Sequence, residues 1–185
     1  VTLEFPDLEK IITLAKKHNV ITVLDNTWGA GLAFKPFDIG EHHLAVDISV
    51  HALTKYPSGG GDVLMGSITT KKKELHIKML RMHALQGIAI SGDEAAQISR
   101  SLPHMALRYK QHQANTKDVI NFLTKRLELT QILHPSLANH TGHEFWQAIC
   151  KTNESAGLVS VIFDTKYQLE DIKKFCNSLQ LFRLG

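Results

Sequence analysis

The chain has 185 residues, of which 43% are hydrophobic and 21% charged, and its formal net charge is +3. This apolar content is sufficient for a packed core in one domain or one and a half. Basic residues are dispersed apart from the run at 71–73, which argues against nucleic-acid binding. Two cysteines are too few for a disulfide framework. Because the sequence also shows no membrane-spanning apolar run and no signal peptide, we expect a cytoplasmic protein without a membrane contact.

Helical and strand-like patterns alternate over the first half of the chain. Asp7 can cap a helix over residues 8–18, whose apolar side chains recur at helical spacing. Strands are predicted over residues 21–24, 46–50 and 63–69, and the first, being almost wholly apolar, should be buried on both faces. Helix followed by buried strand is typical of a mostly parallel α/β sheet. The Gly- and Pro-containing segment 28–40 should be a functional loop.

Helices are predicted through the middle of the chain. Residues 71–86 indicate a surface helix, and Ser91 with Glu94 forms a capping-box pattern before a helix over 95–102. Pro103 can open a further helix, since residues 104–129 lack both Gly and Pro. A helix of that length commonly joins two domains. The boundary is therefore predicted near its C-terminal end, at about residue 127.

The rest of the chain alternates short strands with helices. Strands are predicted at 132–135, 158–163 and 179–185, and helices at 140–150 and 169–179. This order indicates a small α+β domain with an antiparallel sheet. Since residues 1–5 also resemble the end of a strand, we expect the sequence to be a fragment. Residues 1–127 would be the C-terminal part of a large α/β domain, and residues 128–185 the beginning of a small α+β domain.

Two residues at predicted strand ends carry the chemistry. Asp25 closes the first apolar run, and Lys55 follows the second on the loop before the third strand. Ligands of open α/β sheets bind at the carboxyl ends of the strands, where both side chains would lie. A carboxylate and a lysine amine suit pyridoxal 5'-phosphate (PLP), because its ring nitrogen requires an acid and its aldehyde forms a Schiff base with an amine.

Structural explanations of these two residues remain open at this point. An Asp after a strand is often only a turn or cap residue, and a lone Lys is usually solvated surface. The glycines at 59–61 do not form a phosphate-binding P-loop, because Lys55 precedes them instead of following them. His143 and Glu144 approach the zinc motif His-Glu-x-x-His, but Gln147 replaces the second imidazole, so no metal site is predicted. Cys150 and Cys176 fall in apolar helical settings and indicate core packing.

Several segments, in the right order, resemble one known family. Leu24-Asp25-Asn26-Thr27-Trp28, Phe34-Lys35-Pro36, Asp47-Ile48-Ser49 and Thr54-Lys55-Tyr56 resemble the cofactor segment of the Cys/Met-metabolism PLP enzymes. Residues 141–146, with the sequence Thr-Gly-His-Glu-Phe-Trp, resemble in particular the bacterial cystathionine beta-lyases of that family. The resemblance runs through the whole chain. It implies the fold-type I, PLP-dependent transferase-like α/β fold, a mostly parallel sheet flanked by helices.

The resemblance also implies a role for each matching residue. Lys55 would hold PLP and act as the general base, and Asp25 would keep the PLP ring nitrogen protonated. The Thr54 hydroxyl would bind the PLP phosphate, and Thr27 would pack near the ring and its phenolic oxygen. Ala52 stands where many relatives carry a phosphate-binding Ser, a departure that beta-lyases tolerate. Gly60 and Gly61 depart from the Gly-His-Ser-Asp that usually follows the family's lysine.

By resemblance, the protein is a PLP-dependent carbon–sulfur lyase of methionine biosynthesis and transsulfuration. It would cleave L-cystathionine, an amino-acid thioether, by beta-elimination to homocysteine, pyruvate and ammonia. The full enzyme would be a homotetramer, a dimer of dimers that share active sites. A sister enzyme remains an alternative, such as a cystathionine gamma-lyase, a gamma-synthase or a methionine gamma-lyase. A non-catalytic homologue that has kept only the scaffold is the other alternative.

Overall fold

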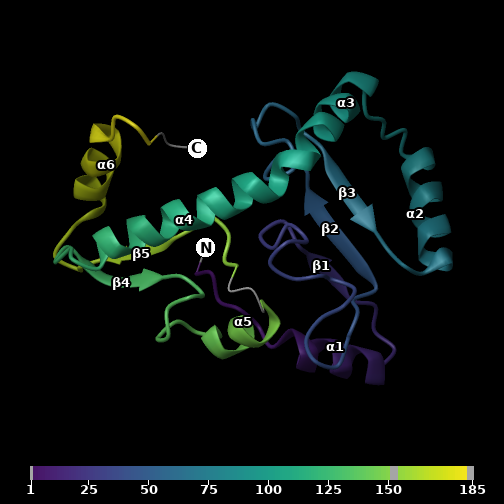
Figure 1. Cartoon of the computed structure of the whole chain (residues 1–185), viewed down its shortest axis with the longest axis horizontal. Coiled ribbons are helices and arrows are strands. Elements are labelled where there is room, and N and C mark those ends of the chain that lie inside the picture. The colour runs from purple at the N-terminus through teal and green to yellow at the C-terminus, as the bar shows by residue number, and fades with distance from the viewer. Residues whose placement is uncertain (1, 151–153, 183–185) are drawn as a thin grey trace.

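The computed structural model describes residues 2–150 and 154–182. A long helix, α4 (Met105–Leu123), runs across the molecule between two small sheets (Figure 1). One sheet contains β1 (Val23–Asp25), β2 (Ile48–Ala52) and β3 (Gly66–Thr69), and the other contains β4 (Leu129–Leu133) and β5 (Ser160–Phe163). No helix in the described part of the chain is long and apolar enough to cross a membrane.

The first sheet is fixed in register by side chains at both ends of its parallel pair. Strands β1 and β2 are parallel, with Asp25 opposite Val50, whereas β3 runs antiparallel to β2. At the start of the pair the Thr22 backbone N–H and hydroxyl both donate to the Asp47 carboxylate, at 2.7 and 2.9 Å. At the other end the Ala52 N–H donates to the Thr27 hydroxyl at 2.9 Å. These bonds fix where both strands end, and therefore where the residues that follow them lie.

The helices of the first half begin at or within three residues of the predicted positions. The Asp7 carboxylate accepts from the Lys10 N–H at the start of α1 (Leu8–Lys17). Ser91 and Glu94 form the predicted capping box of α3 (Gly92–Ser101). Helix α2 (Lys73–Leu85) has no buried residue, in agreement with a surface helix. The segment between Trp28 and Gly40 consists of turns, as expected of a loop.

The second half contains the predicted antiparallel sheet. A 3-10 turn, η1 (Leu102–His104), carries Pro103 in its first turn and leads into α4. Strands β4 and β5 pair antiparallel, with α5 (His143–Ile149) between them in sequence and α6 (Leu169–Ser178) after them. Whether the chain divides at residue 127 into a large-domain part, 1–127, and a small-domain part, 128–185, stays a prediction.

The main core lies where the start of the chain meets α1, α4 and α5. Phe5 packs edge-on against Trp28 and Phe34, with ring centroids 5.8 and 6.0 Å apart. Its N–H donates to the Thr141 carbonyl at 3.3 Å, and Gly142 lies so close that a Cβ there would clash with the Phe5 carbonyl. Trp146 and Tyr109 complete the same buried cluster. The loop after β1 is thereby held between the N-terminal segment and α4.

Four sequence predictions are wrong in detail. The first strand is not buried on both faces, because Ile21 and Val23 are 55% and 61% exposed and no described helix covers them. The helix predicted over 104–129 ends at Leu123, since Leu129 pairs with Phe163 in the second sheet. No strand forms over residues 2–5, whose backbone bonds to Thr141 instead of a neighbouring strand. None forms over 179–182, where no described strand is available to pair; residues 1 and 183–185 lie outside the described residues.

Candidate active site

Asp25 and Lys55 lie at the same edge of the first sheet. Asp25 is the last residue of β1, and Lys55 follows β2 after a short turn in which its N–H donates to the Ala52 carbonyl at 3.2 Å. Because β1 and β2 are parallel, both residues leave the sheet at its carboxyl edge. The spacing argument from the sequence is therefore confirmed in its geometry, while the chemical role of each residue stays a prediction.

The Asp25 carboxylate is held by one hydrogen bond and has one oxygen free. Its Oδ1 accepts from the Thr27 N–H at 2.9 Å, closing a small turn after β1. Among the described residues, none donates to Oδ2. The carboxylate is therefore oriented by the backbone yet available to a further donor, which is what a protonated ring nitrogen would require.

A cavity of about 570 Å³ brings Asp25 and Lys55 together. Thr27, Tyr56, Arg108 and His112 are among its other lining residues. In the described part of the chain, no carboxylate lies within ion-pair distance of the Lys55 amine. An amine that no ion pair occupies is available to form a Schiff base, so its position suits a role as nucleophile or base.

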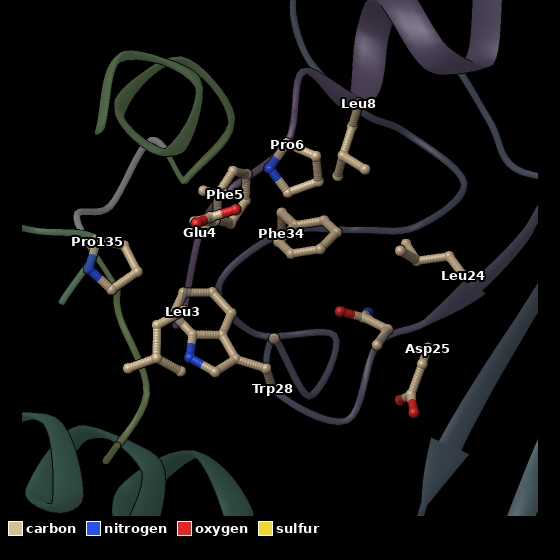
Figure 2. A pocket seen from close by; sticks show the side chains of 12 residues that line it. Leu3, Glu4, Phe5, Pro6, Leu8, Leu24, Asp25, Trp28, Phe34 and Pro135 are labelled. Atoms are coloured by element: carbon tan, nitrogen blue, oxygen red, sulfur yellow. The ribbon is translucent and has the colours of Figure 1, made fainter. Parts of the chain in front are cut away.

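Asp25 also borders two further cavities, of about 290 and 770 Å³. Figure 2 shows the smaller one, where Leu24, Phe34, Trp28 and Phe5 form an apolar wall and the Asp25 carboxylate turns away from it. The carboxylate is thus excluded from the apolar side of β1. Its charge is directed to the open space near Lys55 and β2.

The largest cavity contains a histidine that sequence reasoning missed. His51 lies on β2 and lines this space together with Asp25 and Thr54. Its Nε2 is buried without a hydrogen-bond partner among the described residues. Burial lowers the pKa of His51 below its ordinary value, although the negative charge of Asp25 opposes that shift. A signal was present in the sequence, because His51 directly follows the predicted strand that leads to Lys55. In the structure, His51 lies two residues beyond Ser49, which pairs with Leu24.

The predicted phosphate-side residues are divided between two cavities. Ala52 and Thr54 line the cavity of His51, whereas Thr27 lines that of Lys55. The Thr54 hydroxyl donates to the Met65 carbonyl at 3.4 Å and accepts from the Met65 N–H at 3.2 Å. The Thr27 hydroxyl already accepts from the Ala52 N–H. The two hydroxyls therefore hold the backbone around the site, and their predicted contacts to PLP stay predictions.

Residues from α4, together with Gly157 and Leu158, complete the Lys55 cavity, and the sequence did not single them out. Arg108 and His112 lie one helical turn apart on α4, a spacing that places them on one face. The Tyr56 hydroxyl accepts from the Gly157 N–H at 2.8 Å. Burial raises the pKa of this phenol, so it stays protonated at neutral pH. The adjacency of Tyr56 to Lys55 was the signal that could have found it.

The glycines at 59–61, of which Gly60 and Gly61 depart from the family pattern, form a turn beyond Lys55. Gly59 and Gly61 have positive φ angles of 74° and 68°, which residues with a Cβ adopt at a cost. The Ser58 hydroxyl accepts from the Gly61 N–H at 3.2 Å and closes the turn. Among the described residues, no cluster of side chains could hold a metal ion.

The chain also matches a known family along its whole length. Residues 1–185 match the family of Cys/Met metabolism PLP-dependent enzymes. An L-alanine/L-glutamate racemase from Wolbachia pipientis is 31% identical over the whole chain, which covers 44% of the racemase. A cystathionine beta-lyase from Haemophilus influenzae is 33% identical, again over the whole chain, which covers 45% of the lyase. The chain thus spans less than half the length of these relatives.

Solved structures give the same answer for the fold. A cystathionine gamma-lyase from Lactobacillus plantarum superposes with a TM-score of 0.89 over the whole chain and 46% of its own, at 24% identity. An O-acetylhomoserine (thiol)-lyase homologue from Campylobacter jejuni, solved with N'-pyridoxyl-lysine-5'-monophosphate, superposes with a TM-score of 0.86 at 25% identity; the match covers the whole chain and 52% of that enzyme. These are fold-type I PLP enzymes, and the chain shares their architecture.

The fold is that of the fold-type I PLP-dependent enzymes. The chain belongs to the Cys/Met metabolism PLP-dependent enzyme family. The residues present fit that cofactor, since a carboxylate with a free oxygen and an amine without an acid partner border one cavity.

Proposed function

We propose that Lys55 binds PLP covalently and that Asp25 pairs with its ring nitrogen. The observation that carries this proposal is the shared cavity of about 570 Å³ that both residues line. When bound, PLP supplies an electron sink that stabilises negative charge at the substrate's alpha carbon. The carboxylate of Asp25 would hold a proton on the ring nitrogen by charge attraction. The hydrogen bond that Asp25 accepts from the Thr27 N–H fixes the orientation of this carboxylate.

We further propose that the full-length protein is a carbon–sulfur lyase that cleaves L-cystathionine by beta-elimination. The Lys55 amine, once free and unprotonated, would take the proton from the substrate's alpha carbon as general base. The bond between the beta carbon and sulfur then breaks, and homocysteine leaves with its thiol. The remaining three-carbon unit takes up water and yields pyruvate and ammonia. Support comes from the 33% identity to a cystathionine beta-lyase over the whole chain.

Trapping the cofactor tests the first proposal directly. The full-length protein would be incubated with PLP, reduced with borohydride, digested and analysed by mass spectrometry. We expect the pyridoxyl group on the peptide that contains Lys55. In Lys55→Ala the label should disappear, and turnover should fall by about 10²-fold to 10⁴-fold because the general base is lost. The matched control is Lys78→Ala on the exposed helix α2, which should keep both. Normal turnover in Lys55→Ala would contradict the proposal.

Product analysis separates the proposed reaction from those of the sister enzymes. With L-cystathionine, beta-elimination releases pyruvate, whereas gamma-elimination releases 2-oxobutyrate. A predominance of 2-oxobutyrate would replace the beta-lyase proposal with that of a cystathionine gamma-lyase. A protein that binds no PLP at all would be a non-catalytic homologue that has kept the scaffold.

Racemisation of L-alanine or L-glutamate is a second candidate function. It is favoured by the 31% identity to the Wolbachia racemase along the entire chain. Racemisation requires a proton to be returned to the opposite face of the alpha carbon, so it needs a second acid near Lys55. Apart from Asp25 and Arg108, the titratable side chains that line the same cavity as Lys55 are Tyr56 and His112. Formation of D-alanine or D-glutamate, measured by chiral chromatography, distinguishes this reaction from elimination.

We propose, finally, that the full-length protein assembles as a homotetramer, a dimer of dimers. The proposal rests on the resemblance of the sequence to its family alone. Light scattering coupled to size-exclusion chromatography measures the mass directly. A monomer that turns over substrate at full rate would refute this proposal.

A further inference from the structure

The turn after Lys55 satisfies only part of its own backbone. The Lys55 carbonyl accepts from the Gly59 N–H at 3.1 Å, and the Thr54 carbonyl accepts from the Ser58 hydroxyl at 2.7 Å. The carbonyls of Tyr56, Pro57 and Ser58 receive no donor from within the turn among the described residues. Buried carbonyls without a donor are destabilising, so this turn depends on donors from elsewhere.

Those donors come from the corner between α3 and α4. Arg108 Nη2 donates to the Tyr56 carbonyl at 2.8 Å and more weakly to that of Pro57 at 3.4 Å. The Ser101 hydroxyl donates to the Ser58 carbonyl at 2.6 Å and accepts from Arg108 Nη2 at 2.8 Å. Three successive carbonyls after the lysine are therefore held by one arginine and one serine.

The turn is shaped to receive the guanidinium group. A Cβ on Gly59 would lie 2.5 Å from Arg108 Nε, and the φ of Gly59 is 74°. Only glycine therefore combines this backbone conformation with room for the arginine. The guanidinium holds its N–H donors in a fixed planar fork, whereas the ammonium of lysine sits on a flexible chain and does not reproduce that geometry.

The same turn of α4 also holds the loop that follows Asp25. Tyr109 is fully buried, and its hydroxyl donates to the Trp28 carbonyl at 3.2 Å. Adjacent residues of one rigid helix thus contact the backbone just after Lys55 and just after Asp25. The distance between the amine and the carboxylate is consequently set through α4 as well as through the sheet.

We propose that Arg108 is a positioning residue for Lys55. It acts through the backbone carbonyls of Tyr56 and Pro57, together with Ser101, and keeps the Lys55 amine directed at the cavity that Asp25 borders. This inference rests on the proposed role of Lys55 as the PLP lysine. Displacement of a reacting group by about an ångström lowers a rate by up to about 10²-fold, so removal of this contact affects catalysis without removing a catalytic group.

The test compares Arg108→Gln and Arg108→Lys with the unaltered full-length enzyme loaded with PLP. Arg100→Gln on α3, an exposed arginine without a described partner, is the matched control. We expect kcat to fall about tenfold or more in both Arg108 variants with KM little changed, because only the orientation of Lys55 is altered. The pH at which the absorbance of the Lys55-bound cofactor changes should also shift. Arg100→Gln should match the unaltered enzyme.

Hydrogen exchange gives a readout that does not depend on the cofactor. In PLP-free protein, the peptide that contains residues 55–61 should exchange faster in Arg108→Gln than in Arg100→Gln, because its carbonyl contacts are lost. Peptides from α6 should be unaffected. A peptide 55–61 that exchanges equally in both variants would contradict the inference.

The kinetic outcomes separate this role from two others. A lower melting temperature with unchanged kcat and pH midpoint would make Arg108 a purely structural residue and overturn the proposal. A raised KM with unchanged kcat would mean that Arg108 binds substrate directly, which also overturns it. Failure of the proposed function is distinguishable from both, since the unaltered enzyme would then carry no pyridoxyl label on Lys55.

Discussion

At the scale of single residues, the site depends on contrasting surroundings for two ionisable groups. Asp25 has a backbone donor on one carboxylate oxygen and an open cavity on the other side. Lys55 is exposed to that cavity and has no acid partner among the described residues. A backbone-held carboxylate and an amine without a described acid partner, both on one cavity, form the arrangement that PLP chemistry requires.

The charge of Asp25, more than its shape, should matter for turnover. Asp25→Asn keeps the size of the side chain and can still accept from the Thr27 N–H, so PLP should still become attached to Lys55. Turnover should fall by about 10²-fold to 10³-fold, because a preorganised charge opposite the cofactor is lost. Steady-state kinetics and borohydride trapping measure the two effects separately. Asp118→Asn, on the exposed side of α4, should have neither effect.

Cys150 should be chemically inert in the folded protein. Burial raises the pKa of its thiol to about 12, and the thiolate is the reactive form. Iodoacetamide at pH 8 should therefore label the partly exposed Cys176 and leave Cys150 unmodified until the protein is unfolded. Mass spectrometry of the digested protein reads both sites. Labelling of Cys150 in the native state at a rate similar to Cys176 would show that the thiol is accessible.

At the scale of elements, side chains fix where the strands and helices begin and end. The Thr22–Asp47 and Thr27–Ala52 bonds hold β1 and β2 in register at their two ends. Asp25 and Lys55 therefore leave the sheet together. Helix α4 then contacts the backbone that follows each of them, through Tyr109 and Arg108.

The capping box of α3 should contribute measurably to stability. Ser91 accepts from the Glu94 N–H at 3.1 Å, and Glu94 accepts in return from the Ser91 N–H at 3.3 Å. Ser91→Ala should lower the free energy of unfolding by about 1 kcal/mol, since an N-cap is lost. Ser99→Ala, within the same helix and exposed, is the matched control and should change little. Urea denaturation measures the free energy of unfolding of both variants. Equal values for Ser91→Ala and the unaltered protein would argue that the capping box contributes nothing.

At the scale of the whole molecule, distant segments of the chain are locked together around α5. The His140 Nε2 lies 2.7 Å from the Leu3 carbonyl, and His143 Nδ1 lies 2.8 Å from that of Pro135. His134 is fully buried, with its Nδ1 2.7 Å from the Ser136 hydroxyl. The start of the chain is thus bound to a segment far away in sequence.

His134 should make the fold less stable in acid. Burial lowers its pKa to about 4 from the ordinary 6.5, and the nearby His140 adds to the shift. Between these pH values the unfolded chain binds a proton that the folded protein does not, so stability is full above pH 6.5 and falls toward pH 4. The expected loss is on the order of 3 kcal/mol.

The variant His134→Asn tests this dependence, because its amide can still bond to Ser136 but cannot take up a proton in this range. Urea denaturation measures the free energy of unfolding at pH values from 7 to 4, about the range over which histidines titrate. In His134→Asn this free energy should depend less on pH than in the unaltered protein. His18→Asn, at an exposed helix end, should retain the original slope. Identical slopes in all three proteins would assign the acid sensitivity to other groups.

Local patterns in the sequence were sufficient for most of the elements and for the positions of Asp25 and Lys55 at the strand ends. Capping residues, apolar periodicity and strand-end chemistry act over a few residues, so Asp7, the Ser91 capping box, Asp25 and Lys55 could be identified from the chain alone. Only the tertiary structure decided where α4 ends, which faces of β1 stay open, and that His51, Arg108 and His112 border the cavities. Those features depend on strand pairing and on packing between segments distant in sequence, and no local pattern determines which distant segments meet.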